Sequence, residues 1–217
     1  HAEIADFNSD GIDDIFIASF GVPYLNEDNT NYWEPYPHLI LMSNNGIHEN
    51  IEILQNEPAL QDNLATANNF AHDSSSGDVD GDGNIDVFMN AVLYFSDGQG
   101  NFDIVGLNQK DYMDQWGGGK EKVDKTHAHA STIGDYNNDG IDDLVIFWSD
   151  IATEENEWGA RNWNNILLGP VDKTNPTYLD SDEWGRLPEP FYGPDNANYN
   201  DAESGDINGD GFDDIVV

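Results

Sequence analysis

Residues 135–143 read DYNNDGIDD, and three other segments of the chain repeat this nine-residue pattern. The other copies are DFNSDGIDD at 6–14, DVDGDGNID at 78–86 and DINGDGFDD at 206–214. In every copy Asp or Asn occupies the first, third, fifth and ninth positions, and Gly occupies the sixth. Such a regular repeat indicates one structural unit that recurs along the chain. The copies are named loops 1 to 4 in chain order.

An apolar run follows each acidic loop. These runs cover 15–18, 87–89, 144–148 and 215–217, and short apolar runs bounded by turn residues predict β-strands. Further along, 39–46, 93–102 and 165–170 each hold an apolar strand that ends in a turn. Asn-Gly and Asp-Gly after an apolar run are typical of tight hairpins. Each unit is therefore expected to contain several antiparallel strands.

The spacing of the loops predicts the architecture. They begin at residues 6, 78, 135 and 206, which leaves room for about four short strands per unit. An all-β fold follows, with four-stranded antiparallel blades that form a section of a β-propeller. The expected units are 1–72, 73–129, 130–200 and an incomplete 201–217, within one propeller section. The best candidate for a helix is 56–70, where Leu60, Leu64 and Ala67 have helical spacing.

The acidic loops have the composition of a calcium site. Ca²⁺ takes six to eight oxygen ligands, and a tight loop with carboxylates at alternating positions supplies them. Side chains one, three, five and nine are expected to converge on one ion, with the seventh carbonyl beside them. The predicted ligands are Asp6, Asn8, Asp10 and Asp14; Asp78, Asp80, Asp82 and Asp86; Asp135, Asn137, Asp139 and Asp143; and Asp206, Asn208, Asp210 and Asp214.

These ligands predict about four structural Ca²⁺ ions, one per loop. An EF-hand is excluded because its twelfth position needs a bidentate Glu, whereas here that position holds Ile17, Met89, Ile146 or Val217. Mg²⁺ is less suited, since it resists the dehydration that an all-protein site requires. The alternative is that the loops are solvated turns, because Asp, Asn and Gly favour turns for conformational reasons alone.

The repeats resemble the FG-GAP and VCBS repeats of integrin-α-like β-propellers. The likeness rests on GDVDGDGNIDVF at 77–88, GDYNNDGIDDLVIF at 134–147, GDINGDGFDDIVV at 205–217, the turn GQGNF at 98–102, and His72 and His129, each six residues before a loop. The resemblance implies a calcium-binding propeller of about seven blades in an extracellular or cell-surface protein. It implies further blades of the same natural chain, of which the present sequence is expected to be a fragment.

Charge and composition exclude other classes. The chain has 43 Asp and Glu against seven Lys and Arg, and its net charge of −36 opposes binding to nucleic acid or to an anionic membrane surface. A mean hydropathy of −0.62 does not predict membrane insertion. The absence of Cys excludes disulfides and thiolate metal sites. Aromatic residues make up 12% of the chain, which distinguishes it from a disordered acidic tail.

Long connections at the far end of the strands are the expected recognition surface. They cover 21–38, 107–125, 149–164 and 180–199 and are rich in Trp and Tyr beside polar residues. Aromatic rings with polar neighbours suit a glycan or an extracellular protein. Anchoring of long loops onto the sheets is the alternative role. The candidate ligand-binding residues are Trp33, Tyr36, Trp116, Trp158, Arg161, Trp163 and Trp184.

The predicted function is adhesion or recognition of a glycan or protein. One alternative is a segment of a secreted polysaccharide lyase or hydrolase, and another is a structural subunit of a surface assembly. Catalysis has less support, because His127 and His129 are accompanied by no Ser or Cys nucleophile motif. Glu154, Glu155 and Glu157 are close in sequence, but glycoside hydrolysis depends on carboxylate geometry.

Overall fold

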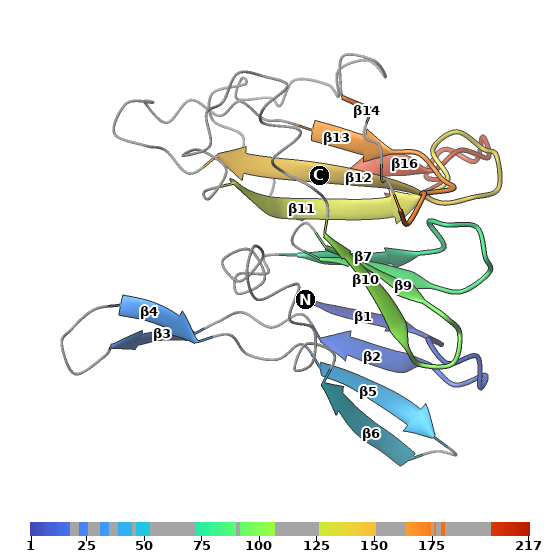
Figure 1. The fold of residues 1–217 in the computed structure, drawn as a ribbon. Coiled ribbons are helices and arrows are strands. Elements are labelled where there is room, and N and C mark those ends of the chain that lie inside the picture. Colours follow the sequence, from blue (N-terminus) through green and yellow to red (C-terminus); the bar gives the residue numbers. More distant parts are fainter. Residues whose placement is uncertain are drawn as a thin grey trace.

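The computed structural model describes residues 1–17, 22–25, 31–34, 39–44, 47–52, 73–89, 92–106, 126–150, 164–174, 176, 179–180 and 201–217. Within these ranges the chain forms strands and turns and no helix (Figure 1). The candidate helix at 56–70 lies outside the described residues. No helix in the described part is long and apolar enough to cross a membrane.

The strands form small antiparallel sheets, as the sequence predicts. The first sheet has the order β1 (Ala2–Ala5), β2 (Asp14–Ile17), β5 (Leu39–Asn44) and β6 (Ile47–Glu52). The second has β7 (Ser74–Gly77), β8 (Asp86–Met89), β9 (Val92–Ser96) and β10 (Phe102–Gly106). The third has β11 (Thr126–Gly134), β12 (Asp143–Asp150), β13 (Asn164–Leu167) and β14 (Leu179–Asp180). A two-stranded sheet pairs β15 (Glu203–Gly205) with β16 (Asp214–Val216).

Each acidic loop joins the first two strands of its sheet. The predicted strand after the loop is present as β2, β8, β12 and β16. Another strand precedes each loop, and the sequence pattern does not predict it. The register is the same in all four sheets, since the residue before the loop pairs with its ninth residue: Ala5↔Asp14, Gly77↔Asp86, Gly134↔Asp143 and Gly205↔Asp214.

Two of the three predicted hairpins are present, whereas no tight hairpin follows 165–170, because β13 pairs with the distant β14 through Ile166 and Leu179. One segment that was expected to be a loop also contains strands. Ser96 pairs with Phe102 across the turn of β9 and β10, and Asn44 pairs with Ile47 between β5 and β6. Within the connection 21–38, β3 (Val22–Leu25) and β4 (Asn31–Glu34) form a separate antiparallel pair. Its sequences VPYL and NYWE contain the β-branched and aromatic residues that favour strands.

The hydrophobic cores lie between consecutive sheets. One cluster joins Phe7 and Phe16 of the first sheet region with Val87, Met89 and Tyr94 of the second. A second cluster combines residues of the second and third sheets, among them Val79, Phe88, Ile133, Leu144 and Val171. In a third, Ala202 next to β15 packs with residues of the third sheet. Burial of apolar surface between the sheets therefore stabilises their association.

The first strands of the sheets are neighbours. β1 contacts β7, β7 contacts β11, and β11 contacts β15. All four acidic loops consequently lie at one end of the molecule, on the right in Figure 1, while the β3–β4 hairpin lies on the left. This arrangement separates the acidic loops from the hairpin that contains Trp33.

Candidate metal centre

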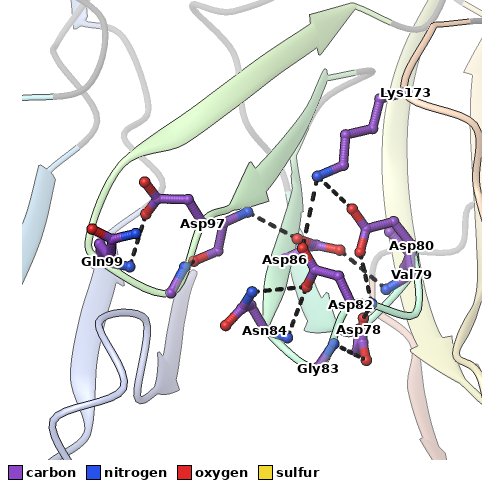
Figure 2. Close-up of polar contacts among 12 residues, drawn as sticks. Asp78, Val79, Asp80, Asp82, Gly83, Asn84, Asp86, Asp97, Gln99 and Lys173 are labelled. Carbon is purple, nitrogen blue, oxygen red and sulfur yellow. Dashed lines mark hydrogen bonds and ion pairs between the residues drawn. The ribbon is translucent and has the colours of Figure 1, made fainter.

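The four acidic loops have the same hydrogen bonds at their first position. In loop 2, Asp78 Oδ1 accepts the backbone N–H of Asp82 at 3.0 Å, and Asp78 Oδ2 accepts that of Gly83 at 2.9 Å (Figure 2). The equivalent Asp in each other loop accepts N–H groups from its own fifth and sixth residues, at distances from 2.7 to 3.0 Å. The first carboxylate therefore closes the loop onto itself.

The third and fifth positions add a second shared layer of bonds. Asp80 Oδ1 accepts the N–H of Asp82 at 3.1 Å, and Asp82 Oδ1 accepts that of Asn84 at 2.9 Å. The other loops make the same two bonds, with an Asn at the third position. One geometry is thus produced four times from sequences that differ at the second, third, fourth, seventh and eighth positions.

Two backbone positions of each loop are left-handed. The sixth residue is Gly in every copy and has φ between 85° and 93°. The fourth residue also has positive φ, at 57° for Ser9 and Asn138, 75° for Gly81 and 80° for Gly209. Gly adopts this region without a steric cost, and Asn does so more readily than most residues. The invariant Gly predicts the sixth position, whereas the fourth, which varies among Ser, Gly and Asn, is not predicted.

The ninth residue connects the loop to the sheet. Asp14, Asp86 and Asp143 are fully buried. Asp86 Oδ2 accepts the N–H of Val79 at 3.1 Å, and its Oδ1 accepts the N–H of Ser96 on β9 at 2.9 Å. Burial raises the pKa of Asp86 to about 7 and that of Asp143 to about 6. Because each carboxylate oxygen has two lone pairs, these bonds still leave capacity for a cation.

Loop 2 brings three of its predicted ligands together. One oxygen each from Asp78, Asp80 and Asp86 lie within 4.8 Å of one another. Oxygens at this separation can share a hard cation with bonds of about 2.3–2.6 Å. In loops 1, 3 and 4 the residue at the third position would offer an amide oxygen to the cation, from Asn8, Asn137 or Asn208. The donor chemistry of these loops fits Ca²⁺, which accepts carboxylate, amide and backbone oxygens together.

The eighth residue links neighbouring loops, a role that the repeated pattern does not predict. Asp142 of loop 3 accepts the N–H of Asp78 on its Oδ2 at 2.8 Å, and its own N–H donates to the Asp78 carbonyl at 3.3 Å. Asp213 of loop 4 contacts Asp135 in the same two ways, at 2.9 and 3.2 Å. Burial raises the pKa of Asp142. The Asp-Asp doublet at positions eight and nine of loops 1, 3 and 4 was the available signal.

A second cluster lies at the other end of the first strands. His1, Asp73 and Asp201 each offer an atom within 4.8 Å of the others, and His1 Nδ1 lies 3.1 Å from Asp73 Oδ1. Asp73 is 4% exposed, and its Oδ2 accepts the N–H of Ser131 on β11 at 2.6 Å. Burial raises the pKa of Asp73 to about 6. This cluster ties β7 to β11, and no repeated motif signals it.

The candidate ligand-binding residues fall mostly outside the described residues. Trp33 lies on β4, where it pairs with Pro23. His127 and His129 lie on β11, whose register shifts between Ala128 and Ala130. The candidates outside the described ranges are Tyr36, Trp116, Trp158, Arg161, Trp163 and Trp184, together with Glu154, Glu155 and Glu157.

Comparison with known proteins adds no family to this geometry. No protein-family model matches the chain, and no curated protein matches it. Functional inference therefore depends on the chemistry of the four loops and on the way the sheets are joined.

Proposed function

We propose that the chain is a section of a calcium-stabilised β-propeller from an extracellular or cell-surface protein, and that it acts as an adhesion or recognition module for a glycan or protein. The observation that carries the proposal is the recurrence of one hydrogen-bonded acidic loop at the same end of successive sheets (Figure 1). The hydrogen bonds of a solvated turn account for the first, third and ninth residues but do not require the Asp that all four loops have at the fifth position.

Support for blades of a propeller comes from the order of contacts. The strand before each acidic loop is the first of its sheet and contacts the first strand of the next sheet. Successive sheets bury their apolar faces against each other. Sheets joined in this way are typical of blades around an axis, with the first strands innermost. Further blades of the same natural chain are the expected neighbours of the outer sheets.

Residue identities in the loops support a cation. Both oxygens of the first Asp accept N–H groups, so an Asn, whose amide nitrogen is a donor, would not replace it. At the fifth position, Asp139 and Asp210 use Oδ1 to accept one N–H, a bond that Asn would make equally well. Asp is nevertheless present there in all four loops. A negative charge at the fifth position is useful if it binds a cation.

Calcium would act on stability. About four ions, one per loop, would offset the repulsion between carboxylates that lie close together. An ion that binds only the folded state stabilises it by about 2.7 kcal/mol per site at a hundredfold excess over Kd. The net charge of −36 leaves a glycan or a protein as the suitable partner and disfavours nucleic acid and membrane insertion.

The test is a count of bound metal combined with thermal melts in EDTA and after Ca²⁺ is restored. We expect about four ions per chain and a rise in Tm of roughly 10 °C or more. Asp139→Ala should lose one ion and part of the shift. Asp103→Ala is the matched control, because it removes one exposed carboxylate from β10 and should keep every ion. No bound metal and an unchanged Tm would contradict the proposal.

Recognition is tested separately, with a panel of glycans and extracellular proteins. Binding by the Ca²⁺-loaded chain should weaken in Trp33→Ala while Tm stays the same, because Trp33 lies on the hairpin remote from the acidic loops (Figure 1). Turnover of a polysaccharide in place of simple binding would favour the lyase or hydrolase alternative.

A further inference from the structure

Loop 2 differs from the other loops in the charge of its ligand positions. Its first, third, fifth and ninth residues are all Asp, whereas loops 1, 3 and 4 have Asn at the third position. The additional carboxylate belongs to Asp80, whose side chain is only 6% exposed. A charge that is removed from water needs a partner of opposite charge.

Lys173 supplies that partner from another sheet. Its Nζ lies 2.5 Å from Asp80 Oδ2 and 3.9 Å from Asp82 Oδ2 (Figure 2). Lys173 follows β13 of the third sheet, whereas Asp80 belongs to the loop of the second. It is the one Lys or Arg among the residues that the structure describes. The only Lys or Arg side chain in the described part of an acidic molecule is therefore placed on a predicted metal ligand.

Neighbouring contacts hold Lys173 in position. The N–H of Val171 donates to the carbonyl of Val79 in loop 2 at 2.8 Å, and both side chains are buried in one cluster. The ammonium also lies 5.0 Å from the centre of the Phe95 ring, within the range of a cation–π contact. These contacts fix the backbone beside loop 2, so the Lys173 head group can leave Asp80 while its segment stays attached.

We propose that Lys173 is an internal competitor of the divalent cation at loop 2, so that this loop binds its ion more weakly than it would without the ammonium. This inference rests on the proposed calcium function. A cation shared by Asp78, Asp80 and Asp86 would lie beside a positive group that already bonds Asp80. Occupation of loop 2 therefore requires the ammonium to move away from Asp80. In loops 1, 3 and 4 the Asn at the third position gives an ammonium no carboxylate to bind.

The expected effect of the ammonium is roughly tenfold in Kd at loop 2, from the repulsion between a divalent ion and a unit charge a few ångströms apart in a screened, partly exposed site. The test is a Ca²⁺ titration followed by the ¹⁵N–¹H resonances of four glycines, Gly11, Gly83, Gly140 and Gly211. Each donates its N–H to the first Asp of its own loop, so each reports on one site.

Lys173→Met should tighten binding at Gly83 by roughly tenfold and leave Gly11 in loop 1 unchanged, with smaller changes at Gly140 and Gly211. Lys173→Gln, a second neutral substitution with a polar end group, should give the same result and controls for any effect of the apolar Met side chain on packing against Phe95. In an Asp80→Asn background, which gives loop 2 the same ligand types as the other loops, the lysine substitution should have little effect. Lys110→Met, which changes the net charge equally, is the control for a general electrostatic effect.

The outcomes separate the two proposals. If Gly11, Gly140 and Gly211 titrate but Lys173→Met leaves the affinity at Gly83 unchanged or weakens it, Lys173 is only a structural anchor and the inference is wrong. An equal change for Lys110→Met would also overturn it, because the effect would then be nonspecific. If no glycine responds to Ca²⁺, the proposed metal function fails, and this inference fails with it.

Discussion

At the scale of single residues, hydrogen-bond capacity explains which positions are Asp and which tolerate Asn. Asp86 uses both oxygens to accept N–H groups, one from Val79 in its own loop and one from Ser96 on β9, and Asp143 likewise accepts those of Tyr136 and Gly169. An Asn would turn an NH₂ group toward a backbone donor at such a site. Asn137, by contrast, accepts a single N–H through Oδ1. Backbone donors therefore account for Asp at the ninth position and for Asn at the third, whereas they do not require the Asp at the fifth position.

The buried carboxylate of Asp73 should make the stability of the fold depend on pH. Burial raises its pKa from 3.8 to about 6, and the charges of Asp201 and Glu3 act in the same direction. Because the folded-state pKa lies above the unfolded one, protonation of Asp73 stabilises the folded state. This stabilisation is fully present below about pH 4 and is lost as the pH rises through 6. In EDTA, the free energy of unfolding should fall by about 1 kcal/mol from pH 5 to pH 8 through this group.

The measurement is urea unfolding at both pH values. Asp73→Asn should reduce the difference between pH 5 and pH 8 by about 1 kcal/mol, and the raised pKa values of Asp86 and Asp143 should maintain the rest. Asp103→Asn, on the exposed surface of β10, should leave the difference as in the parent chain. Equal pH dependence in the parent and Asp73→Asn would show that Asp73 does not titrate in this range.

At the scale of elements, the strand after each loop was predictable and the strand before it was not. β8 and β12 each begin at the last Asp of a recognisable acidic motif and continue into an apolar run. β7 consists of three Ser residues and a Gly, with no apolar alternation. Its strand conformation depends on partners that are remote in sequence, since Ser74 and Ser76 donate to Glu3 and Ser75 donates to Ser131. Such contacts cannot be predicted from the strand propensity of the local sequence.

Glycines before the loops follow the same logic and give a matched pair of variants. A Cβ on Gly77 would lie 2.2 Å from Ile133 Cγ2 and 2.6 Å from Asp142 Oδ2, whereas a Cβ on Gly205 would meet nothing within 4 Å. Gly77→Ala should therefore cost about 1–3 kcal/mol in unfolding free energy, because it overpacks the junction with the third sheet. Gly205→Ala, at the same register position of β15, should change stability by less than about 0.5 kcal/mol.

Urea unfolding of the two variants in Ca²⁺ provides the comparison. Similar losses for both would mean that backbone flexibility at this position matters more than the space beside it.

At the scale of the whole molecule, the charge is the dominant property. A net charge of −36 on 217 residues produces repulsion that acts over a Debye length of about 10 Å at 0.1 M salt and about 3 Å at 1 M. Tm in EDTA should therefore rise by several degrees between 0.1 and 1 M NaCl, and the rise should be smaller in Ca²⁺. A Tm that is independent of salt in EDTA would contradict this account of the charge.

The way the sheets join was the least accessible feature from sequence. The repeat and its spacing predicted small antiparallel sheets, but the bond between Asp142 and Asp78 joins residues 64 positions apart. The ion pair between Lys173 and Asp80 was also not predicted. Lys173 belongs to no motif and reaches Asp80 only because Val171 docks on Val79. Contacts between repeats therefore cannot be predicted from the sequence of one motif, whereas the hydrogen bonds within a repeat follow from it.

The link between the eighth and first positions has a consequence for cooperativity. Asp142 holds the backbone of Asp78, and Asp213 holds that of Asp135, so the first ligand of loops 2 and 3 is oriented by the next loop along the chain. Occupation of one site would therefore favour its neighbour, as in a one-dimensional array with nearest-neighbour coupling. Loop 1 lies outside this array, because Ile85 replaces the carboxylate at its junction with loop 2 and packs with Ala5 against an apolar cluster. Ions in loops 2 to 4 would fill in concert, while loop 1 would fill alone.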